Sequence, residues 1–215
     1  QADDVEPSLP DASQVLVTVR AASINPVDFK IRGGKYPAVK EDRLPYTLGR
    51  DVSGFVEKCG AQATAFKIGD EVFGMVGING GGYAEKAVLD QKAIARKPAS
   101  LDHIHAAAIP LAGQTAWQGL FRHGQLKAGQ SVLIHGGSGG VGHFAVQFAK
   151  AKGARVLTTV STDNVDFARS LGADIVIDYK TQRFEDHASN LDMVFALVDG
   201  ETRERSGALL KREGV

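Results

Sequence analysis

The 215-residue sequence predicts an α/β protein in which a β-rich first part precedes a parallel sheet covered by helices. Three observations support this class. Up to residue 100, short runs that alternate apolar and polar residues are separated by turns. Beyond residue 100, helical patterns alternate with continuous apolar runs, which are typical of strands covered on both faces. A glycine-rich turn joins the first of these runs to an amphipathic helix.

The β-rich part is predicted to form a first domain, residues 1–100. Residues 14–22 (QVLVTVRAA) alternate apolar and polar side chains, as a half-buried strand does. Further strands are predicted for residues 51–58, 71–76 and 83–89.

The second domain is predicted to span residues 101–215. Its strands and helices alternate as β-α-β-α-β, which is the pattern of a parallel sheet with covering helices. A complete doubly wound sheet would need roughly 60–80 more residues, so only the first half of a Rossmann-type sheet is expected, and the chain is expected to be a fragment. Helices are predicted at 101–109 (ended by Pro110), 113–123, 140–152, 164–171, 184–189 and 201–213, and strands at 131–135, 154–161, 173–179 and 191–198.

Composition excludes several classes of protein. Lys plus Arg equals Asp plus Glu at 25 each, so no net charge attracts nucleic acid or an anionic membrane. The apolar runs are too short to span a bilayer. The single cysteine, Cys59, rules out an internal disulfide and an all-cysteine zinc site. We therefore expect a cytoplasmic protein that binds neither nucleic acid nor membranes.

The strongest motif lies between residues 137 and 142. The sequence GSGGVG fits G-x-G-x-x-G, directly after the strand SVLIH and directly before the amphipathic helix. The early glycines would let the backbone approach a pyrophosphate, and the last would let the helix pack closely on the strand. A turn of this kind can also serve packing alone, but the order of strand, turn, helix and second strand favours a nicotinamide dinucleotide. The predicted cofactor-binding residues here are Gly137, Ser138, Gly139, Gly140, Val141 and Gly142.

The choice of dinucleotide depends on the end of the next strand. An NAD site usually places an acidic residue there, but this sequence has Ser161 and Thr162, which leave room for a 2′-phosphate. Asp163 follows two residues after Ser161 and is explained alternatively as an acid in the first turn of a helix. We predict NADPH as the cofactor, with NADH as the alternative.

Several ordered motifs resemble the zinc-free quinone oxidoreductase branch of the medium-chain dehydrogenase/reductase family. The resemblance implies a GroES-like, β-rich catalytic domain ahead of a Rossmann domain. The motifs are AASINPVDFKIRGG (21–34), PYTLGRDVSGFV (45–56), FKIGDEVFG (66–74), GGYAEKAV (81–88), AAIPLAGQTAWQGL (107–120), VLIHGGSGGVGHFAVQFAK (132–150) and SLGADIVIDY (170–179).

The resemblance also bears on metal binding. Where zinc-dependent relatives carry their ligands, this sequence has Asn25, Arg50 and the cysteine-free stretch 111–114. Arginine cannot ligate a metal, because it stays protonated and only donates hydrogen bonds. His103 and His105 are two residues apart on a predicted helix and so point in different directions. We expect no metal.

By the same resemblance, Asn25 and Asp28 line the place where the nicotinamide meets the substrate. Asn25 is the best candidate to donate a hydrogen bond to the substrate oxygen, although N-P-x-D is also a helix-start signal that could only cap the loop. Tyr46 could present its hydroxyl to the substrate, or could equally be a half-buried core residue.

The resemblance places two further residues at the cofactor. Thr115 matches a position beside the nicotinamide, and Tyr179 matches one near the 2′-phosphate, where Lys180 could add charge. The family often carries a basic residue just after the second strand, but this sequence has Val165 in that region.

The sequence therefore predicts an NADPH-dependent reductase of quinones or α,β-unsaturated carbonyls that works by metal-free hydride transfer. One alternative is a zinc-free enoyl-thioester reductase. Another is a redox-sensing protein that binds the cofactor without turnover. The expected partner is a small-molecule quinone or enone, and the full-length form is expected to be a homodimer.

Overall fold

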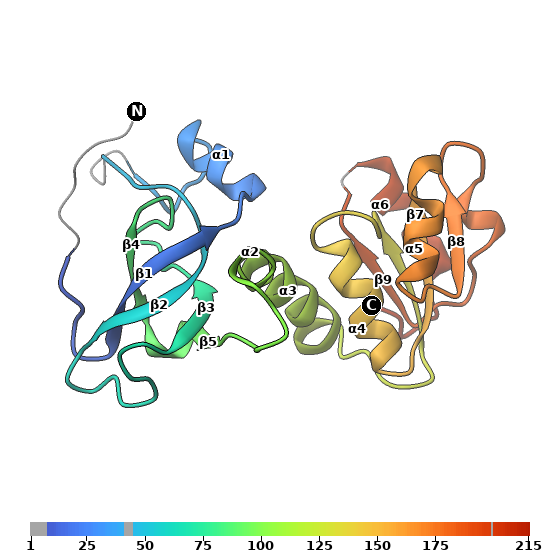
Figure 1. Cartoon of the computed structure of the whole chain (residues 1–215). Helices are drawn as coiled ribbons and strands as arrows, with labels where there is room; N and C mark the ends of the chain where they lie inside the picture. The colour runs from blue at the N-terminus through green and yellow to red at the C-terminus, as the bar shows by residue number, and fades with distance from the viewer. Residues whose placement is uncertain (1–7, 41–44, 199) are drawn as a thin grey trace. The chain divides into compact units, whose positions relative to one another are not determined.

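The computed structural model describes residues 8–40, 45–198 and 200–215 (Figure 1). The chain divides into two compact units, residues 1–111 and residues 112–215.

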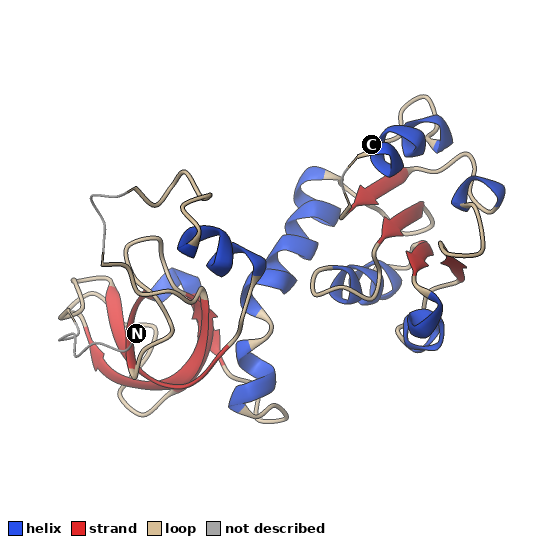
Figure 2. Cartoon of the chain, turned by 90° about the horizontal axis from the view of Figure 1, so that it is seen from above, coloured by secondary structure: helices blue, strands red, loops and turns tan. Residues whose placement is uncertain are grey.

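The first unit is built on an antiparallel sheet with the strand order β4-β1-β2-β3-β5. Figure 2 shows these strands curling around a core as a half-barrel. Apolar side chains of β1 and β2 fill that core, among them Val15, Val17, Val52 and Val56. The strands are β1 (Gln14–Ala22), β2 (Asp51–Cys59), β3 (Glu71–Met75), β4 (Lys86–Asp90) and β5 (Ile94–Arg96).

Two short helices belong to this unit. Helix α1 (Pro26–Arg32) follows β1, and it begins with a proline, whose missing N–H is no loss in the first turn. Helix α2 (His103–Ala107) packs on β1 and β2. Asp102 caps α2 by accepting a hydrogen bond from the amide of His105 at 2.8 Å.

The second unit is built on a parallel sheet with the strand order β8-β7-β6-β9. Consecutive residues of β6 alternate between two cores. Val132 and Ile134 pack with one cluster, which includes α4, and Leu133 packs with the other. This two-sided burial explains the continuous apolar run SVLIH. The strands are β6 (Ser131–His135), β7 (Arg155–Val160), β8 (Ile175–Asp178) and β9 (Met193–Ala196), and the helices named below are α3 (Pro110–Trp117), α4 (Gly142–Ala151), α5 (Val165–Ser170) and α6 (Glu201–Ser206).

The predicted fold class is confirmed: an antiparallel half-barrel precedes a parallel α/β sheet. The bounds of two predicted helices need correction. The helix before Pro110 does end ahead of the proline, at Ala107, but Pro110 itself begins the next helix, α3, which continues as a π-helix over Gln118–His123. The helix predicted for residues 201–213 ends at Ser206, because Leu210 adopts an extended conformation and forms a parallel bridge with Leu191. Within the described part of the chain, no helix is long and apolar enough to cross a membrane.

Candidate functional site

The glycine turn lies where β6 passes into α4. Gly136 has a φ of 75°, a left-handed conformation that L side chains rarely adopt. The amides of Gly136 and Gly137 both donate to the carbonyl oxygen of Thr159 in β7, at 3.0 and 3.1 Å. The amide of Gly139 then donates to the Gly136 oxygen at 3.0 Å, which closes the turn.

Two glycines of the motif are required by the protein's own packing. A Cβ on Gly137 would lie 2.0 Å from the Thr158 hydroxyl oxygen, and one on Gly142 would lie 2.0 Å from the Gly136 carbonyl oxygen. These distances leave no room for a side chain. The last glycine therefore packs against the backbone of the turn itself, and not against the strand as the motif predicts.

Gly140 has no such internal requirement. It is exposed, its φ lies outside the left-handed region, and a Cβ built on it would meet no atom within 4 Å. The amides of Ser138 and Gly140 donate no hydrogen bond to another described residue. Both lie in the turn that leads into α4, whose N-terminal dipole favours an anion. Exposed backbone without a side chain, unused amides and a positive helix end together fit a pyrophosphate.

A buried polar chain supports the turn from behind. His135, the last residue of β6, is 1% exposed, and its ring nitrogens lie 3.0 Å from Thr159 Oγ1 and 2.9 Å from Ser206 Oγ. Because Ser206 donates its own hydrogen to the Thr202 oxygen, it must accept from His135 Nε2. Thr159 Oγ1 then donates to His135 Nδ1 and accepts from the Gly136 amide. Burial lowers the pKa of His135 to about 4, so the ring is neutral.

The loop after β7 carries the predicted 2′-phosphate residues. Ser161 Oγ accepts a hydrogen bond from Asn164 Nδ2 at 2.8 Å, which leaves the Ser161 hydroxyl hydrogen available to a ligand. Thr162 instead donates its hydroxyl to Asp178 at 2.7 Å. This hydrogen bond lowers the pKa of Asp178, whose carboxylate stands at the end of β8. Asp163 lies in a short 3₁₀ helix (Thr162–Asn164) that precedes α5, whose own first-turn acid is Asp166.

Tyr179 lies beside this loop. Its amide donates to the Val160 oxygen at 3.1 Å, immediately before Ser161, and its side chain is 58% exposed. Lys180 is also exposed, and its amide donates to Asp178 Oδ1 at 3.0 Å. The structure therefore brings Ser161 and Tyr179 together on the second unit. Thr115 lies within α3.

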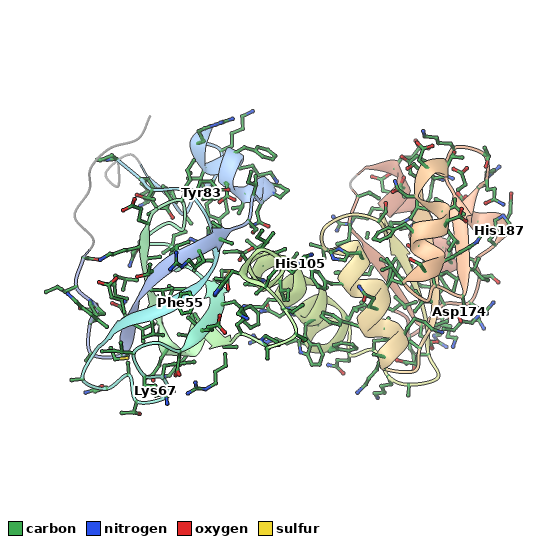
Figure 3. The ribbon with its side chains drawn as sticks, viewed as in Figure 1. Phe55, Lys67, Tyr83, His105, Asp174 and His187 are labelled. Atoms are coloured by element: carbon green, nitrogen blue, oxygen red, sulfur yellow. The ribbon has the colours of Figure 1, made fainter. Side chains whose placement is uncertain are left out.

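In the first unit, Asp28 is a buried cap with both carboxylate oxygens engaged. Its Oδ2 accepts from the Asn25 amide at 2.8 Å and from the Tyr83 hydroxyl at 2.9 Å. Its Oδ1 accepts from the Gly49 amide at 3.2 Å. Tyr83, labelled in Figure 3, also donates toward the Ser23 carbonyl oxygen. Burial and the neighbouring Asp28 carboxylate raise the pKa of Tyr83 to about 12. These contacts favour the capping alternative for Asp28.

The Asn25 side chain joins a second buried network. Its amide nitrogen donates to Asp51 Oδ2 at 2.9 Å and to Ser23 Oγ at 3.0 Å. Asp51 is fully buried and accepts two further hydrogen bonds, from Ser23 Oγ at 2.8 Å and from the Leu111 amide at 3.0 Å. Burial raises the pKa of Asp51, although its donors act in the opposite direction.

Tyr46 directs its hydroxyl at backbone oxygens. The hydroxyl hydrogen is shared between the carbonyls of Ile78 at 3.0 Å and Gly80 at 3.2 Å. Tyr46 also lines an open hollow of about 270 Å³ with Pro45, Thr47, Asn79 and Gly80. In this arrangement the Tyr46 hydroxyl hydrogen is engaged by the protein's own backbone and not offered to a ligand.

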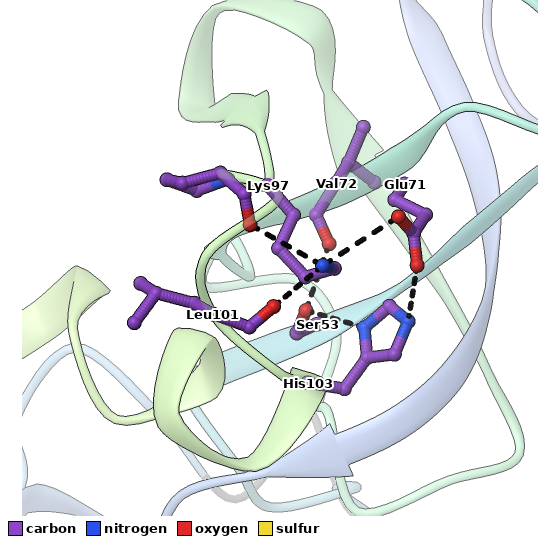
Figure 4. Close-up of polar contacts among 7 residues, drawn as sticks. Ser53, Glu71, Val72, Lys97, Leu101 and His103 are labelled. Atoms are coloured by element: carbon purple, nitrogen blue, oxygen red, sulfur yellow. Dashed lines mark hydrogen bonds and ion pairs between the residues drawn. The ribbon is translucent and has the colours of Figure 1, made fainter.

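A serine, a histidine and a glutamate meet elsewhere in the first unit (Figure 4). His103 Nδ1 lies 2.8 Å from Ser53 Oγ, and His103 Nε2 lies 3.2 Å from Glu71 Oε1. Lys97 lies 3.5 Å from the other Glu71 oxygen. Ser53 is fully buried in β2 and donates to the Val72 oxygen at 3.1 Å, so its hydroxyl is not presented to a substrate. The cluster fastens α2 to the sheet and is not a nucleophilic triad.

Comparison with known proteins agrees with the two-part architecture. Residues 11–99 match the alcohol dehydrogenase GroES-like domain, and residues 140–215 match the family described as zinc-binding dehydrogenase. The 2-methylene-furan-3-one reductase of Solanum lycopersicum is 42% identical over 194 residues, which are 86% of this chain and 50% of the relative. Other curated relatives are named as mitochondrial or chloroplastic.

Solved structures allow a comparison of geometry. The quinone oxidoreductase of Coxiella burnetii is 38% identical with a TM-score of 0.90, over 99% of this chain and 68% of that one. The chain belongs to the medium-chain dehydrogenase/reductase family. Within this family it falls in the quinone oxidoreductase branch: Escherichia coli quinone oxidoreductase complexed with NADPH is 31% identical with a TM-score of 0.87, over 100% of this chain and 67% of that one. The chain spans about half the length of the curated relatives it matches.

The structure describes Arg50, one of the positions at which this member of the medium-chain dehydrogenase/reductase family differs from the expected zinc-dependent pattern. The Arg50 guanidinium donates to the Gly77 oxygen at 3.0 Å and cannot act as a ligand. Among residues 8–40, 45–198 and 200–215, no group of three or more His, Cys, Asp or Glu side chains is placed to hold a metal ion. The zinc-free assignment stays a prediction.

Sequence reasoning missed three residues that organise the first-unit site of this family member: Ser23, Asp51 and Tyr83. Asp51 lies 26 residues from Asn25, and Tyr83 lies 55 residues from Asp28. The acid in the motif GRD was the only signal for Asp51, and the comparison with zinc ligands directed attention to Arg50 instead.

Proposed function

We propose that this protein is an NADPH-dependent reductase of quinones or α,β-unsaturated carbonyls. The observation that carries the proposal is the glycine turn, because Gly140 is open on its Cβ side and the nearby amides of Ser138 and Gly140 are unused. Bound NADPH would supply a hydride to an electrophilic carbon of the substrate. Family membership supports this chemistry.

The residues of the chain would bind and orient the two reactants. The turn of residues 137–142 would hold the pyrophosphate at the N-terminus of α4. Ser161 and Tyr179 would contact the 2′-phosphate, with Thr115 beside the nicotinamide. Asn25 and its neighbours would face the reacting end, and the Tyr46 hollow would contact an apolar part of the substrate.

The cofactor is proposed to be NADPH and not NADH. The unengaged Ser161 hydroxyl hydrogen supports this choice, since it can donate to a phosphate oxygen. The exposed side chains of Tyr179 and Lys180 support it further. The compartment is proposed to be the cytoplasm, although named relatives reside in mitochondria and chloroplasts.

The glycine turn can be tested with matched glycine substitutions. Gly140→Val places a side chain where the structure has open space, so the melting temperature should stay unchanged. The same side chain should obstruct the pyrophosphate and weaken NADPH binding by at least about tenfold, measured by fluorescence titration. Gly77→Val is the control, because Gly77 is also exposed and open on its Cβ side but lies in the first unit.

Gly142→Ala should behave differently from Gly140→Val, because a Cβ at position 142 collides with the turn backbone. We expect a lower melting temperature in addition to weaker binding. Unchanged NADPH affinity in folded Gly140→Val would contradict the proposed site. Turnover is then measured as NADPH oxidation with a small quinone, an enone and an enoyl thioester, which separates the proposed substrates from the thioester alternative.

A further inference from the structure

Hydrogen bonds to Asp51 and Ser23 fix the orientation of the Asn25 side-chain amide. Its nitrogen donates to Asp51 Oδ2 and to Ser23 Oγ, at 2.9 and 3.0 Å. A primary amide has two hydrogens to donate, and both are used. The oxygen faces the backbone amide of Asp28 in the capping box that begins α1, and its second lone pair is what this amide has left for a ligand.

Chemistry fixes the direction of the amide. An ionised carboxylate only accepts hydrogen bonds, so the Asn25 atom that faces Asp51 must be nitrogen. Ser23 Oγ and the Leu111 amide also donate to this carboxylate. With three donors around a fully buried carboxylate, turning the amide over would place its oxygen against an oxygen of Asp51. Such a flip would leave a buried anion short of one partner, which is unfavourable.

We propose that Asp51 is a positioning residue that holds Asn25 as a hydrogen-bond acceptor in the active site. The proposal rests on the proposed function, which places Asn25 at the reacting end. The Asn25 oxygen would accept from a donor group of the cofactor or substrate, such as a carboxamide N–H or a hydroxyl. Asn25 therefore does not stabilise charge on a substrate oxygen, in contrast to the role that its sequence position suggests.

A reciprocal exchange of the two side chains tests this inference. Asn25→Asp alone places two carboxylates against each other. Asp51→Asn alone leaves only one acceptor oxygen at position 51, so its new amide nitrogen must face either the Asn25 nitrogen or the Leu111 amide. In the double variant Asn25→Asp/Asp51→Asn, the new amide at position 51 donates to the new carboxylate at position 25. The pairing is restored, and position 25 still presents an oxygen but has no N–H at all.

The expected result is rescue. Each single variant should lose at least about tenfold in kcat/KM for NADPH oxidation, and the double variant should recover to within about threefold of the wild type. If Asn25 acts as a donor, the double variant stays as low as Asn25→Asp although its melting temperature recovers, and the proposal is overturned. The control is Asp90→Asn, since Asp90 also accepts from a serine hydroxyl and a backbone amide, of Ser13 and Lys92. It should leave kcat/KM unchanged.

A second measurement needs no turnover. In the ligand-free protein, the side-chain amide protons of Asn25 should exchange slowly with solvent by NMR, and Asp51→Asn should accelerate that exchange. Fast exchange in the wild type overturns the inference. If the wild type oxidises no NADPH with any substrate, the proposed function fails, and the amide exchange still decides whether Asp51 holds Asn25.

Discussion

Glycines of one motif are present for different reasons. A side chain at position 137 would collide with the Thr158 hydroxyl, and one at position 142 would collide with the Gly136 carbonyl, so Gly137 and Gly142 are required by packing. Gly140 faces open space, so the protein's own packing does not explain its lack of a side chain. Packing therefore explains the glycine at two positions of the motif, whereas the open space at the third position suggests a ligand.

The choice between NADPH and NADH can be tested at Ser161. Ser161→Asp introduces a carboxylate where a 2′-phosphate is expected, and the two like charges should repel each other. The ratio of NADPH to NADH affinity should fall by roughly tenfold or more. Asp163→Asn provides the comparison and should leave this ratio unchanged. A wild type that already prefers NADH, and gains NADPH affinity from Asp163→Asn, would show that Asp163 determines the preference.

The sequence predicted the residues of the glycine turn, because a local motif carries its own geometry. It did not predict the partners of Asn25 and Asp28. Asp51 and Tyr83 come from β2 and from the segment before β4, and only the antiparallel sheet brings them to α1. Such contacts depend on strand register, which cannot be obtained from residue types along a single sequence.

Elements were predicted better in type than in extent. The strands of the parallel sheet fall where apolar runs predict them, because burial on both faces leaves a strong pattern. The strand predicted for residues 83–89 begins only at Lys86. Before it, the amides of Gly82 and Tyr83 donate to the carbonyls of Gly49 and Leu48, so this segment follows another loop and does not continue the strand.

His135 joins β6 to β7 and α6, and the lowered pKa of its buried ring predicts that stability depends on pH. The pKa of His135 is about 4 in the folded protein and near 6.5 when unfolded, so the unfolded chain binds more protons between these values. The free energy of unfolding should therefore fall as the pH drops from about 6.5 to 4, by up to about 3 kcal/mol. Urea unfolding at several pH values measures this loss.

The histidine variants separate this effect from other titrations. His135→Gln should flatten the pH dependence in that range, whereas exposed His123→Gln should keep it. Equal pH dependence in both variants would show that the buried ring does not control it.

For the whole molecule, composition and the alternation of elements were sufficient to predict the two-part α/β architecture. The physical reason is that β6 is buried between two cores. Each face of the parallel sheet must be covered by apolar side chains, and these come from helices and strands that follow one another in a fixed order along the chain. At Arg50, where the family resemblance leads us to expect a zinc ligand in zinc-dependent relatives, the guanidinium donates to a backbone oxygen.

The protein should accordingly contain far less than one zinc ion per molecule. Elemental analysis of protein purified without added zinc measures this directly, and NADPH oxidation should withstand prolonged incubation with a chelator. Near-stoichiometric zinc whose removal abolishes activity would overturn the zinc-free assignment.

The strand order of the first unit has a consequence for synthesis on the ribosome. Strand β1 emerges early, yet it lies between β2 and β4, with Val17 paired to Val56 on one side and to Ala87 on the other. The nascent chain must therefore carry an apolar strand with an open edge until residue 90 has left the exit tunnel. During that interval β1 is exposed to pairing with other chains and to chaperones. Strands β6 and β7, by contrast, can pair as soon as residues 131–160 have emerged.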